Sequence, residues 1–249
     1  MTGRSTQNEK AASRIRLSEI FTSIEGEGIF FGTKTMFVRL AGCPLKCHWC
    51  DTTYAIPMDS GDEHSIEDVK GMIAKDLQKN TFKVNFTGGE PLVQHEAVIE
   101  LAKFVKEKKV KTYLESACYD SARFAKVLPY IDICKIEFKM SDAKAVDAKH
   151  QANLIKSEME CLKMAVSAGK KPYVKIVVTN STDIEEFSGL VKKIFTEAGA
   201  KNIAGFIIQP SYKIDEPVLD RLFAFYDAVY PLYDQVRVVP QLHKIIGAR

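Results

Sequence analysis

Short apolar runs alternate along this chain with longer amphipathic segments. In residues 96–108, for example, Val98, Leu101, Ala102 and Val105 recur at helical spacing and share one face. The amphipathic segments predict helices at residues 66–78, 96–108, 121–127, 158–167, 184–198 and 216–230. The short runs predict strands at residues 16–21, 36–40, 82–86, 110–115, 131–137, 173–179, 203–208 and 236–239. The chain is therefore expected to be an α/β protein.

Two of the helix starts also carry a capping signal. Ser65 with Asp68 and Ser157 with Glu160 both match the capping-box spacing, in which each side chain bonds the backbone of the other residue. These pairs predict helices that begin at residues 66 and 158.

Strands that alternate with helices of this length form right-handed βαβ units around a parallel sheet. We expect a mostly parallel sheet that curls into a full or partial barrel, in a single domain over residues 15–249 that follows a disordered polar tail over residues 1–14. Ligands of such sheets bind beyond the carboxyl ends of the strands. The segments after residues 40 and 86 should therefore meet Glu115, Glu137 and Gln209 on one rim.

Composition and charge limit which partners this protein is expected to bind and which cellular compartment it is expected to occupy. The chain is 46% hydrophobic and 27% charged, as in globular proteins, and its formal net charge of +3 is too small to indicate nucleic acid or an anionic membrane surface. The sequence contains no run of 18 or more apolar residues, which a transmembrane helix would need, and residues 1–14 lack the apolar core of a signal peptide. We therefore expect a cytoplasmic protein.

Three of the six cysteines, Cys43, Cys47 and Cys50, lie within eight residues. Without a secretion signal, such a triplet indicates metal or redox chemistry rather than a disulfide framework. Three thiolates on a [4Fe–4S] cluster leave one iron open to bind and activate a substrate. The alternative is a structural zinc site with His48 or a distant residue as fourth ligand, although no second pair of ligands is evident.

The triplet resembles the Cys-x3-Cys-x2-Cys signature of the radical S-adenosylmethionine superfamily. The run from Gly88 to Pro91, which follows a predicted strand, is similar to the superfamily motif that contacts the amino group of S-adenosylmethionine. The resemblance implies a partial (β/α) barrel in which the catalytic Cys43, Cys47 and Cys50 hold a [4Fe–4S] cluster that cleaves S-adenosylmethionine to a 5′-deoxyadenosyl radical. It implies an S-adenosylmethionine site made of Trp49, Cys50, Asp51, Gly89, Ser116, Glu137, Phe138, Lys139, Gln209, Pro210, Ser211 and Tyr212. Residues 137–139 stand where relatives often carry Ser-Pro-Lys.

Further segments narrow the resemblance to one family. Residues 19–28 (Glu-Ile-Phe-Thr-Ser-Ile-Glu-Gly-Glu-Gly), residues 35–43 and residues 236–244 resemble the 7-carboxy-7-deazaguanine synthases. These enzymes rearrange 6-carboxy-5,6,7,8-tetrahydropterin into 7-carboxy-7-deazaguanine and release ammonia, for the 7-deazapurines queuosine and archaeosine of tRNA. The resemblance implies hydrogen abstraction from C6, ring contraction, return of a hydrogen, and a requirement for Mg²⁺.

The same resemblance assigns binding positions. It implies that Ile24, Glu25, Gly26, Arg39, Thr87 and Arg249 bind the pterin. Many relatives carry Gln at the position of Glu25, and the guanidinium of Arg39 suits the pterin carboxylate. Thr52 matches the Mg²⁺ ligand, while His243 and Lys244 lie where relatives close over the substrate. A homodimer and an electron-donor protein are also implied, with no direct contact to nucleic acid or membrane.

Two other functions are compatible with the cysteine loop. A glycyl-radical activating enzyme shares the cluster and a short barrel but acts on a protein partner. A non-enzymatic module would use zinc to organise a binding surface. Cys118, Cys134 and Cys161 match no motif and are expected to be buried thiols.

Overall fold

The computed structural model describes residues 14–248, so that Arg249, predicted to contact substrate, lies outside the described residues. Within this range the chain forms one nine-stranded sheet. Its strands are β1 (Arg14–Ile24), β2 (Lys34–Leu40), β3 (Asp62–Ser65), β4 (Lys83–Gly88), β5 (Lys111–Ser116), β6 (Ile133–Phe138), β7 (Tyr173–Val178), β8 (Gly205–Pro210) and β9 (Val236–Val238). Arg14, assigned to the polar tail from the sequence, is the first residue of β1.

The sheet is mostly parallel, as the sequence predicts. The strand order is β3-β1-β2-β4-β5-β6-β7-β8-β9, and every neighbouring pair from β2 to β9 is parallel. The antiparallel pairings are those of β1, with β2 on one side and with β3 on the other. Because β3 and β9 form two separate edges, the sheet is a partial rather than a closed barrel.

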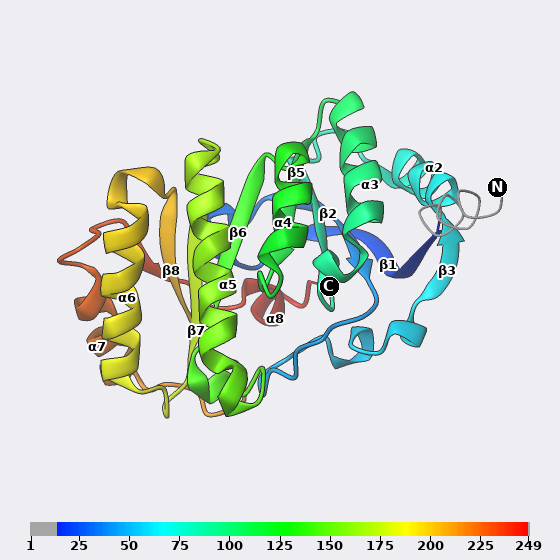
Figure 1. Ribbon diagram of the computed structural model, residues 1–249. Helices are drawn as coiled ribbons and strands as arrows, with labels where there is room; N and C mark the ends of the chain where they lie inside the picture. The colour runs from blue at the N-terminus through cyan, green and yellow to red at the C-terminus, as the bar shows by residue number, and fades with distance from the viewer. Residues whose placement is uncertain (1–13, 249) are drawn as a thin grey trace.

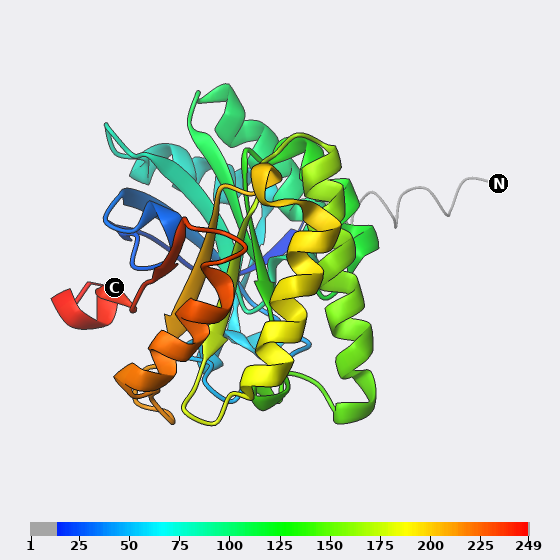
Figure 2. The same ribbon diagram turned by 90° about the vertical axis from the view of Figure 1, so that its left-hand side faces the viewer.

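Helices cover one face of this sheet, and a short helix near the C-terminus lies on the other face (Figures 1 and 2). They are α2 (Ile66–Asp76), α3 (His95–Glu107), α4 (Ser121–Val127), α5 (Ala148–Ser167), α6 (Ile184–Ala198), α7 (Leu219–Val229) and the short α8 (Leu242–Ile246). Figures 1 and 2 show α3 to α6 packed side by side against the sheet, whereas α8 lies on the opposite face. Within residues 14–248, every helix is either too short or too polar to span a lipid bilayer.

The parallel strands are buried on both faces, but the two faces differ in chemistry. Toward the helices they present apolar side chains, such as Val84, Phe86 and Ile176, which form the main core. Because successive side chains alternate across a strand, the intervening positions face the inside of the barrel. There the strands place mainly polar and charged residues, all of them buried or half-buried: Lys83, Asn85, Thr87, Glu115, Lys135, Glu137, Lys175 and Gln209.

The structure corrects the helix start predicted at residue 158. Helix α5 begins at Ala148, ten residues earlier, so Ser157 and Glu160 are interior residues and no capping box forms there. The Ser157 hydroxyl instead donates to the carbonyl of Cys118 at 2.7 Å. The Ser65–Asp68 capping box of α2 is confirmed. Strand β3 and helix α8 were not predicted.

Candidate active site

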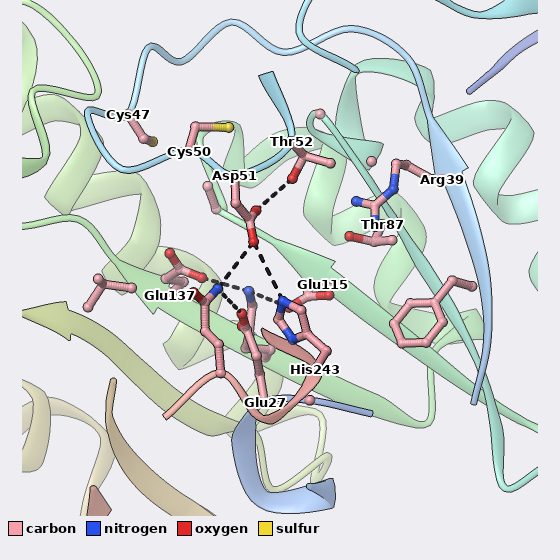
Figure 3. A pocket seen from close by; sticks show the side chains of 18 of the residues that line it. Glu27, Arg39, Cys47, Cys50, Asp51, Thr52, Thr87, Glu115, Glu137 and His243 are labelled. Carbon is pink, nitrogen blue, oxygen red and sulfur yellow. Dashed lines mark hydrogen bonds and ion pairs between the residues drawn. The ribbon is translucent and has the colours of Figure 1, made fainter. Parts of the chain in front are cut away.

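A cavity of about 420 Å³ opens at the carboxyl ends of the parallel strands. Its walls come from β1, β2 and β4 to β8, from the loop after β2 that carries the cysteine triplet, and from the segment around α8. Glu115, Glu137 and Gln209 line it together with Gly88 and the three cysteines. The predicted convergence of strand ends on one rim is therefore present, as Figure 3 shows for the labelled residues.

The cysteine loop is held by backbone bonds and leaves its sulfurs at the cavity. The amides of Lys46 and His48 donate to the carbonyls of Ala145 and Ala143 at 2.9 and 2.8 Å. Cys43, Cys47 and Cys50 are free, half-buried thiols that line the cavity.

Burial raises the pKa of Cys43 to about 12 and also raises the pKa of Cys50. These thiols would ionise only beside a strong positive charge, which metal ligation supplies.

The spacing of the sulfurs bears on which metal group fits. A tetrahedral zinc ion, with Zn–S bonds of about 2.3 Å, would hold its sulfurs about 3.8 Å apart. Among the residues described, only Glu27, Asp51 and His243 bring their ligand atoms within 4.8 Å of one another, and the three sulfurs do not. The wider separation suits a multi-iron cluster.

Two glycines allow the end of β4 to pack directly on the start of the cysteine loop. Gly88 has a φ of 149°, and a Cβ there would lie 2.2 Å from the carbonyl oxygen of Leu40. A Cβ on Gly89 would lie 2.5 Å from the carbonyl oxygen of Gly42. Backbone bonds fill that space, since the Glu90 amide donates to the same Gly42 oxygen at 2.8 Å. Both glycines are therefore required for the backbone to approach so closely.

Glu90, next to these glycines, is a fully buried carboxylate with three donors. It accepts hydrogen bonds from the Leu92 amide, the Ala117 amide and the Ser116 hydroxyl at 2.8 to 2.9 Å. Glu90 thus joins the end of β4 to the end of β5, and it holds Ser116 at the cavity wall.

Inside the barrel, alternating lysines and glutamates form a buried ladder of ion pairs. Lys135 Nζ lies 2.9 Å from Glu115 and 2.6 Å from Glu137, while Lys175 Nζ lies 2.6 Å from Glu27 and 3.0 Å from Glu137. Burial alone would raise the pKa of Glu115, but Lys135 and Lys175 outweigh it and lower that pKa to about 2. The same balance lowers the pKa of Glu137. The floor of the cavity is therefore a set of fixed charges rather than a neutral surface.

Sequence reasoning missed Lys83, Lys135, Lys175 and Glu27 as parts of this site. A signal was present, because Lys83, Asn85 and Thr87, like Lys135 and Glu137, occupy every second position of a strand that is otherwise apolar. Buried lysines occur almost only with partners, so this spacing indicates a charged interior.

The residues predicted to bind substrate lie along the opposite wall. Ile24, Glu25 and Gly26 follow each other at the end of β1 and all line the cavity. Arg39 on β2 and Thr87 on β4 are direct partners in the parallel register, and both line the cavity. Figure 3 shows these two side chains next to each other, apart from the cysteine loop.

Asp51 links the cysteine loop to the segment around α8. It accepts hydrogen bonds from Thr52 Oγ1 at 2.9 Å and Gln241 Nε2 at 3.2 Å, and pairs with Lys244 Nζ at 3.2 Å and His243 Nε2 at 3.7 Å. Burial would raise the pKa of Asp51, but His243 and Lys244 outweigh it and lower the pKa. Figure 3 shows Asp51 between Thr52 and His243, so these residues form one side of the cavity mouth.

The positions predicted for S-adenosylmethionine divide into two groups. The first group lines the cavity: Trp49, Cys50, Asp51, Gly89, Ser116, Glu137, Lys139 and Gln209. The buried Nε1 of Trp49 and Oε1 of Gln209 have no hydrogen-bond partner among residues 14–248, which leaves both open to a ligand. The second group is absent from the wall: Phe138 lies in the main core, Tyr212 is an exposed residue, and Pro210 and Ser211 lie at and just beyond the end of β8.

Comparison with known proteins agrees with this geometry. A family model described as a 4Fe-4S single cluster domain matches residues 24–161. The chain is 31% identical over 245 residues to the 7-carboxy-7-deazaguanine synthase of Methanocaldococcus jannaschii, covering 93% of this chain and 99% of the relative. It is 31% identical to the synthase of Archaeoglobus fulgidus over 95% of this chain and all of that one.

Solved structures share the fold. QueE from Escherichia coli superimposes with a TM-score of 0.66 at 17% identity, covering 98% of this chain and 100% of that chain. A domain of a pyruvate-formate lyase-activating enzyme from Bacteroides vulgatus superimposes with a TM-score of 0.51 at 14% identity, covering 63% of this chain and 98% of that chain. The partial barrel is thus common to different activities, and the site must distinguish them.

Proposed function

This chain belongs to the 7-carboxy-7-deazaguanine synthase family, and we propose from this premise how its cavity converts 6-carboxy-5,6,7,8-tetrahydropterin into 7-carboxy-7-deazaguanine with release of ammonia. It is a radical S-adenosylmethionine lyase of 7-deazapurine biosynthesis. The observation that carries the proposal is that a single cavity holds the three free cysteines on one wall and the Arg39–Thr87 pair on another.

The cysteine wall fits the cofactors. Cys43, Cys47 and Cys50 would hold a [4Fe–4S] cluster, and the positive charge of its iron would favour the thiolate forms of Cys43 and Cys50, whose pKa values burial raises. Cluster and S-adenosylmethionine together supply a 5′-deoxyadenosyl radical when bound. Eight residues line the cavity around the loop and are the proposed contacts of S-adenosylmethionine: Trp49, Cys50, Asp51, Gly89, Ser116, Glu137, Lys139 and Gln209. Phe138, Pro210, Ser211 and Tyr212 do not line the cavity, and their contact with S-adenosylmethionine stays a prediction.

The opposite wall fits the pterin. Arg39 binds its carboxylate, because a guanidinium can donate two parallel hydrogen bonds to a carboxylate. Thr87, beside Arg39 in the register, contributes a further polar contact. The backbone of Ile24, Glu25 and Gly26 borders the ring system, and Arg249, which lies outside the described residues, is a further proposed contact.

Glu25 differs from the glutamine of many relatives, and the structure provides a reason why a carboxylate is tolerated there. Lys83 Nζ lies 2.5 Å from Glu25 Oε2 and 2.7 Å from the hydroxyl of Thr35. The buried lysine therefore compensates the extra negative charge.

Thr52 is the proposed Mg²⁺ ligand. Its hydroxyl lies at the cavity wall beside the carboxylate of Asp51, and oxygen ligands are those that Mg²⁺ prefers. We further propose that the enzyme acts as a homodimer in the cytoplasm and receives its electron from a separate donor protein.

An anaerobic assay tests the proposed function. Reconstituted, reduced protein is given S-adenosylmethionine, Mg²⁺ and 6-carboxytetrahydropterin, and mass spectrometry follows 7-carboxy-7-deazaguanine. Product formation that depends on all three additions is expected. Cleavage of S-adenosylmethionine without this product would reject the pterin substrate and retain the radical chemistry, whereas protein that binds zinc and no iron would reject both.

A further inference from the structure

Glu19, Arg39 and Thr87 form a row across three neighbouring strands. Glu19 on β1 is the register partner of Arg39 on β2, and Arg39 is the register partner of Thr87 on β4. All three side chains line the cavity. The row therefore places a carboxylate, a guanidinium and a hydroxyl side by side on one wall of the cavity.

A break in the strand register is what brings Glu19 into this row. Residues two apart on a regular strand share a face, yet Leu17 lies in the apolar core and Glu19 lines the cavity. The β1–β2 register shifts between these two residues, as in a β-bulge. Bulges next to active sites commonly redirect a side chain. The chain thus departs from regular pairing at the point where Glu19 meets Arg39.

The contacts of Glu19 and Phe21 restrain the Arg39 side chain. Glu19 Oε1 accepts a hydrogen bond from Arg39 Nε at 2.8 Å, and the Arg39 guanidinium carbon lies 5.7 Å from the centre of the Phe21 ring. Phe21 is itself stacked on Phe37 with 4.9 Å between ring centres. Within residues 14–248, neither terminal nitrogen of Arg39 has a hydrogen-bond partner. The two terminal NH2 groups are thus left to a ligand.

A second hydrogen bond fixes Glu19 in turn. The hydroxyl of Tyr54 donates to the same Oε1 at 2.8 Å. Tyr54 lies in the turn that directly follows Thr52, so Glu19 joins the arginine wall to the cysteine loop.

We propose that Glu19 is a positioning residue that presents Arg39 as a two-pronged clamp, and that it thereby sets the selectivity for a pterin bearing a 6-carboxylate over one without it. The inference rests on the proposed function, because it takes the 6-carboxylate as the ligand of Arg39. A restrained guanidinium loses less freedom on binding, and its planar fork matches a carboxylate in one orientation.

Binding measurements test this selectivity without turnover. The fluorescent probes are 6-carboxypterin and unsubstituted pterin, titrated into reconstituted protein with S-adenosylmethionine bound. Glutamine at residue 19 can still accept from Arg39 Nε but carries no charge, and a charged hydrogen bond is stronger than a neutral one by about 10-fold in an equilibrium constant. In Glu19→Gln we therefore expect the preference for 6-carboxypterin to fall about 10-fold or more, with the affinity for pterin unchanged. In Tyr54→Phe we expect a smaller fall, and in Arg39→Lys a fall at least as large as in Glu19→Gln.

Steady-state kinetics and a matched control complete the test. Glu19→Gln should raise KM for the carboxytetrahydropterin while leaving kcat and the iron content near wild type. Glu63→Gln, which removes an exposed partner of Arg14 and Arg16, should change neither measurement.

Three results would overturn the proposal: wild-type protein without a preference for 6-carboxypterin, an unchanged preference in Glu19→Gln, or an equal loss of affinity for both probes. The two proposals can fail separately. If wild-type protein prefers 6-carboxypterin and Glu19→Gln abolishes that preference, but the protein forms no 7-carboxy-7-deazaguanine, the role of Glu19 stands and the proposed reaction is rejected.

Discussion

Lys83 Nζ lies 2.5 Å from Glu25 Oε2, and this ion pair is closed off from solvent at the inner end of the cavity. Burial lowers the pKa of Lys83 and raises that of Glu25, so each charge depends on the other. Removing one partner of a buried pair leaves the other uncompensated. The effect of losing Lys83 on the stability of the fold should therefore depend on whether residue 25 is charged.

The single substitution Lys83→Met should lower the free energy of unfolding by about 3–5 kcal/mol. Lys83→Met combined with Glu25→Gln should recover most of this loss, because no isolated charge remains. Urea unfolding followed by circular dichroism measures both. Lys103→Met, which breaks an exposed pair with Glu100, should cost less than about 1 kcal/mol. Equal stability of the single and double variants would contradict the coupling.

Each cysteine of the loop should be needed for turnover. Cys43→Ala, Cys47→Ala and Cys50→Ala are each expected to abolish product formation, because a cluster with one open iron needs a thiolate on each of its other three irons. Cys134→Ala, at a buried thiol of the core, should retain activity and serves as the control. Iron content and product are measured together, and an active loop variant would argue against the three-ligand cluster.

Gly88→Ala should be strongly destabilising. The added Cβ would lie 2.2 Å from the Leu40 carbonyl oxygen, and the φ of 149° is unfavourable for alanine. We expect a loss of about 2–4 kcal/mol from overpacking and backbone strain. Gly71→Ala in α2 meets no atom within 4 Å and should stabilise by about 0.5–1 kcal/mol. Thermal unfolding compares the two, and similar midpoints would count against the close backbone approach.

Stability should fall in acid partly through Glu115. Lys135 and Lys175 outweigh burial and lower its pKa from 4.5 to about 2, so its stabilising contribution is complete above pH 4.5 and is lost as the pH falls toward 2. The contribution at neutral pH is at most about 3 kcal/mol. The difference in unfolding free energy between wild type and Glu115→Gln should therefore shrink between pH 5 and pH 2. A difference that stays constant over this range would refute the assignment.

The sequence predicted the arrangement of the site better than its electrostatics. Alternating strands and helices place their carboxyl ends at one edge, so the meeting of Gly88, Glu115, Glu137 and Gln209 with the cysteines followed from topology alone. Strand β3 was missed because its sequence, Asp-Glu-His-Ser, has no apolar alternation and pairs only at an edge. The five-residue α8 is too short for a periodic signal.

The remaining misses come from contacts between distant segments. Nothing local reveals that Lys83 pairs with Glu25 or Lys175 with Glu27, because the barrel interior is assembled from separate strands. Capping-box spacing also occurs by chance inside a helix, and only the contact of the Ser157 hydroxyl with the distant carbonyl of Cys118 reveals its role. The bulge before Glu19 is likewise visible only once β1 is paired with β2.

The charged interior also gives this protein built-in reporters of its own motions. Lys83, Lys135 and Lys175 are all less than 5% exposed, whereas lysines such as Lys103 and Lys156 are open to solvent. An amine-reactive label should therefore modify the surface lysines first. It should reach Lys83, which does not line the cavity, only when the barrel opens, whereas Lys135 and Lys175 face the cavity and also report its access. Mass spectrometry of the labelled peptides would then time the opening of the barrel at Lys83, with no substitution in the chain.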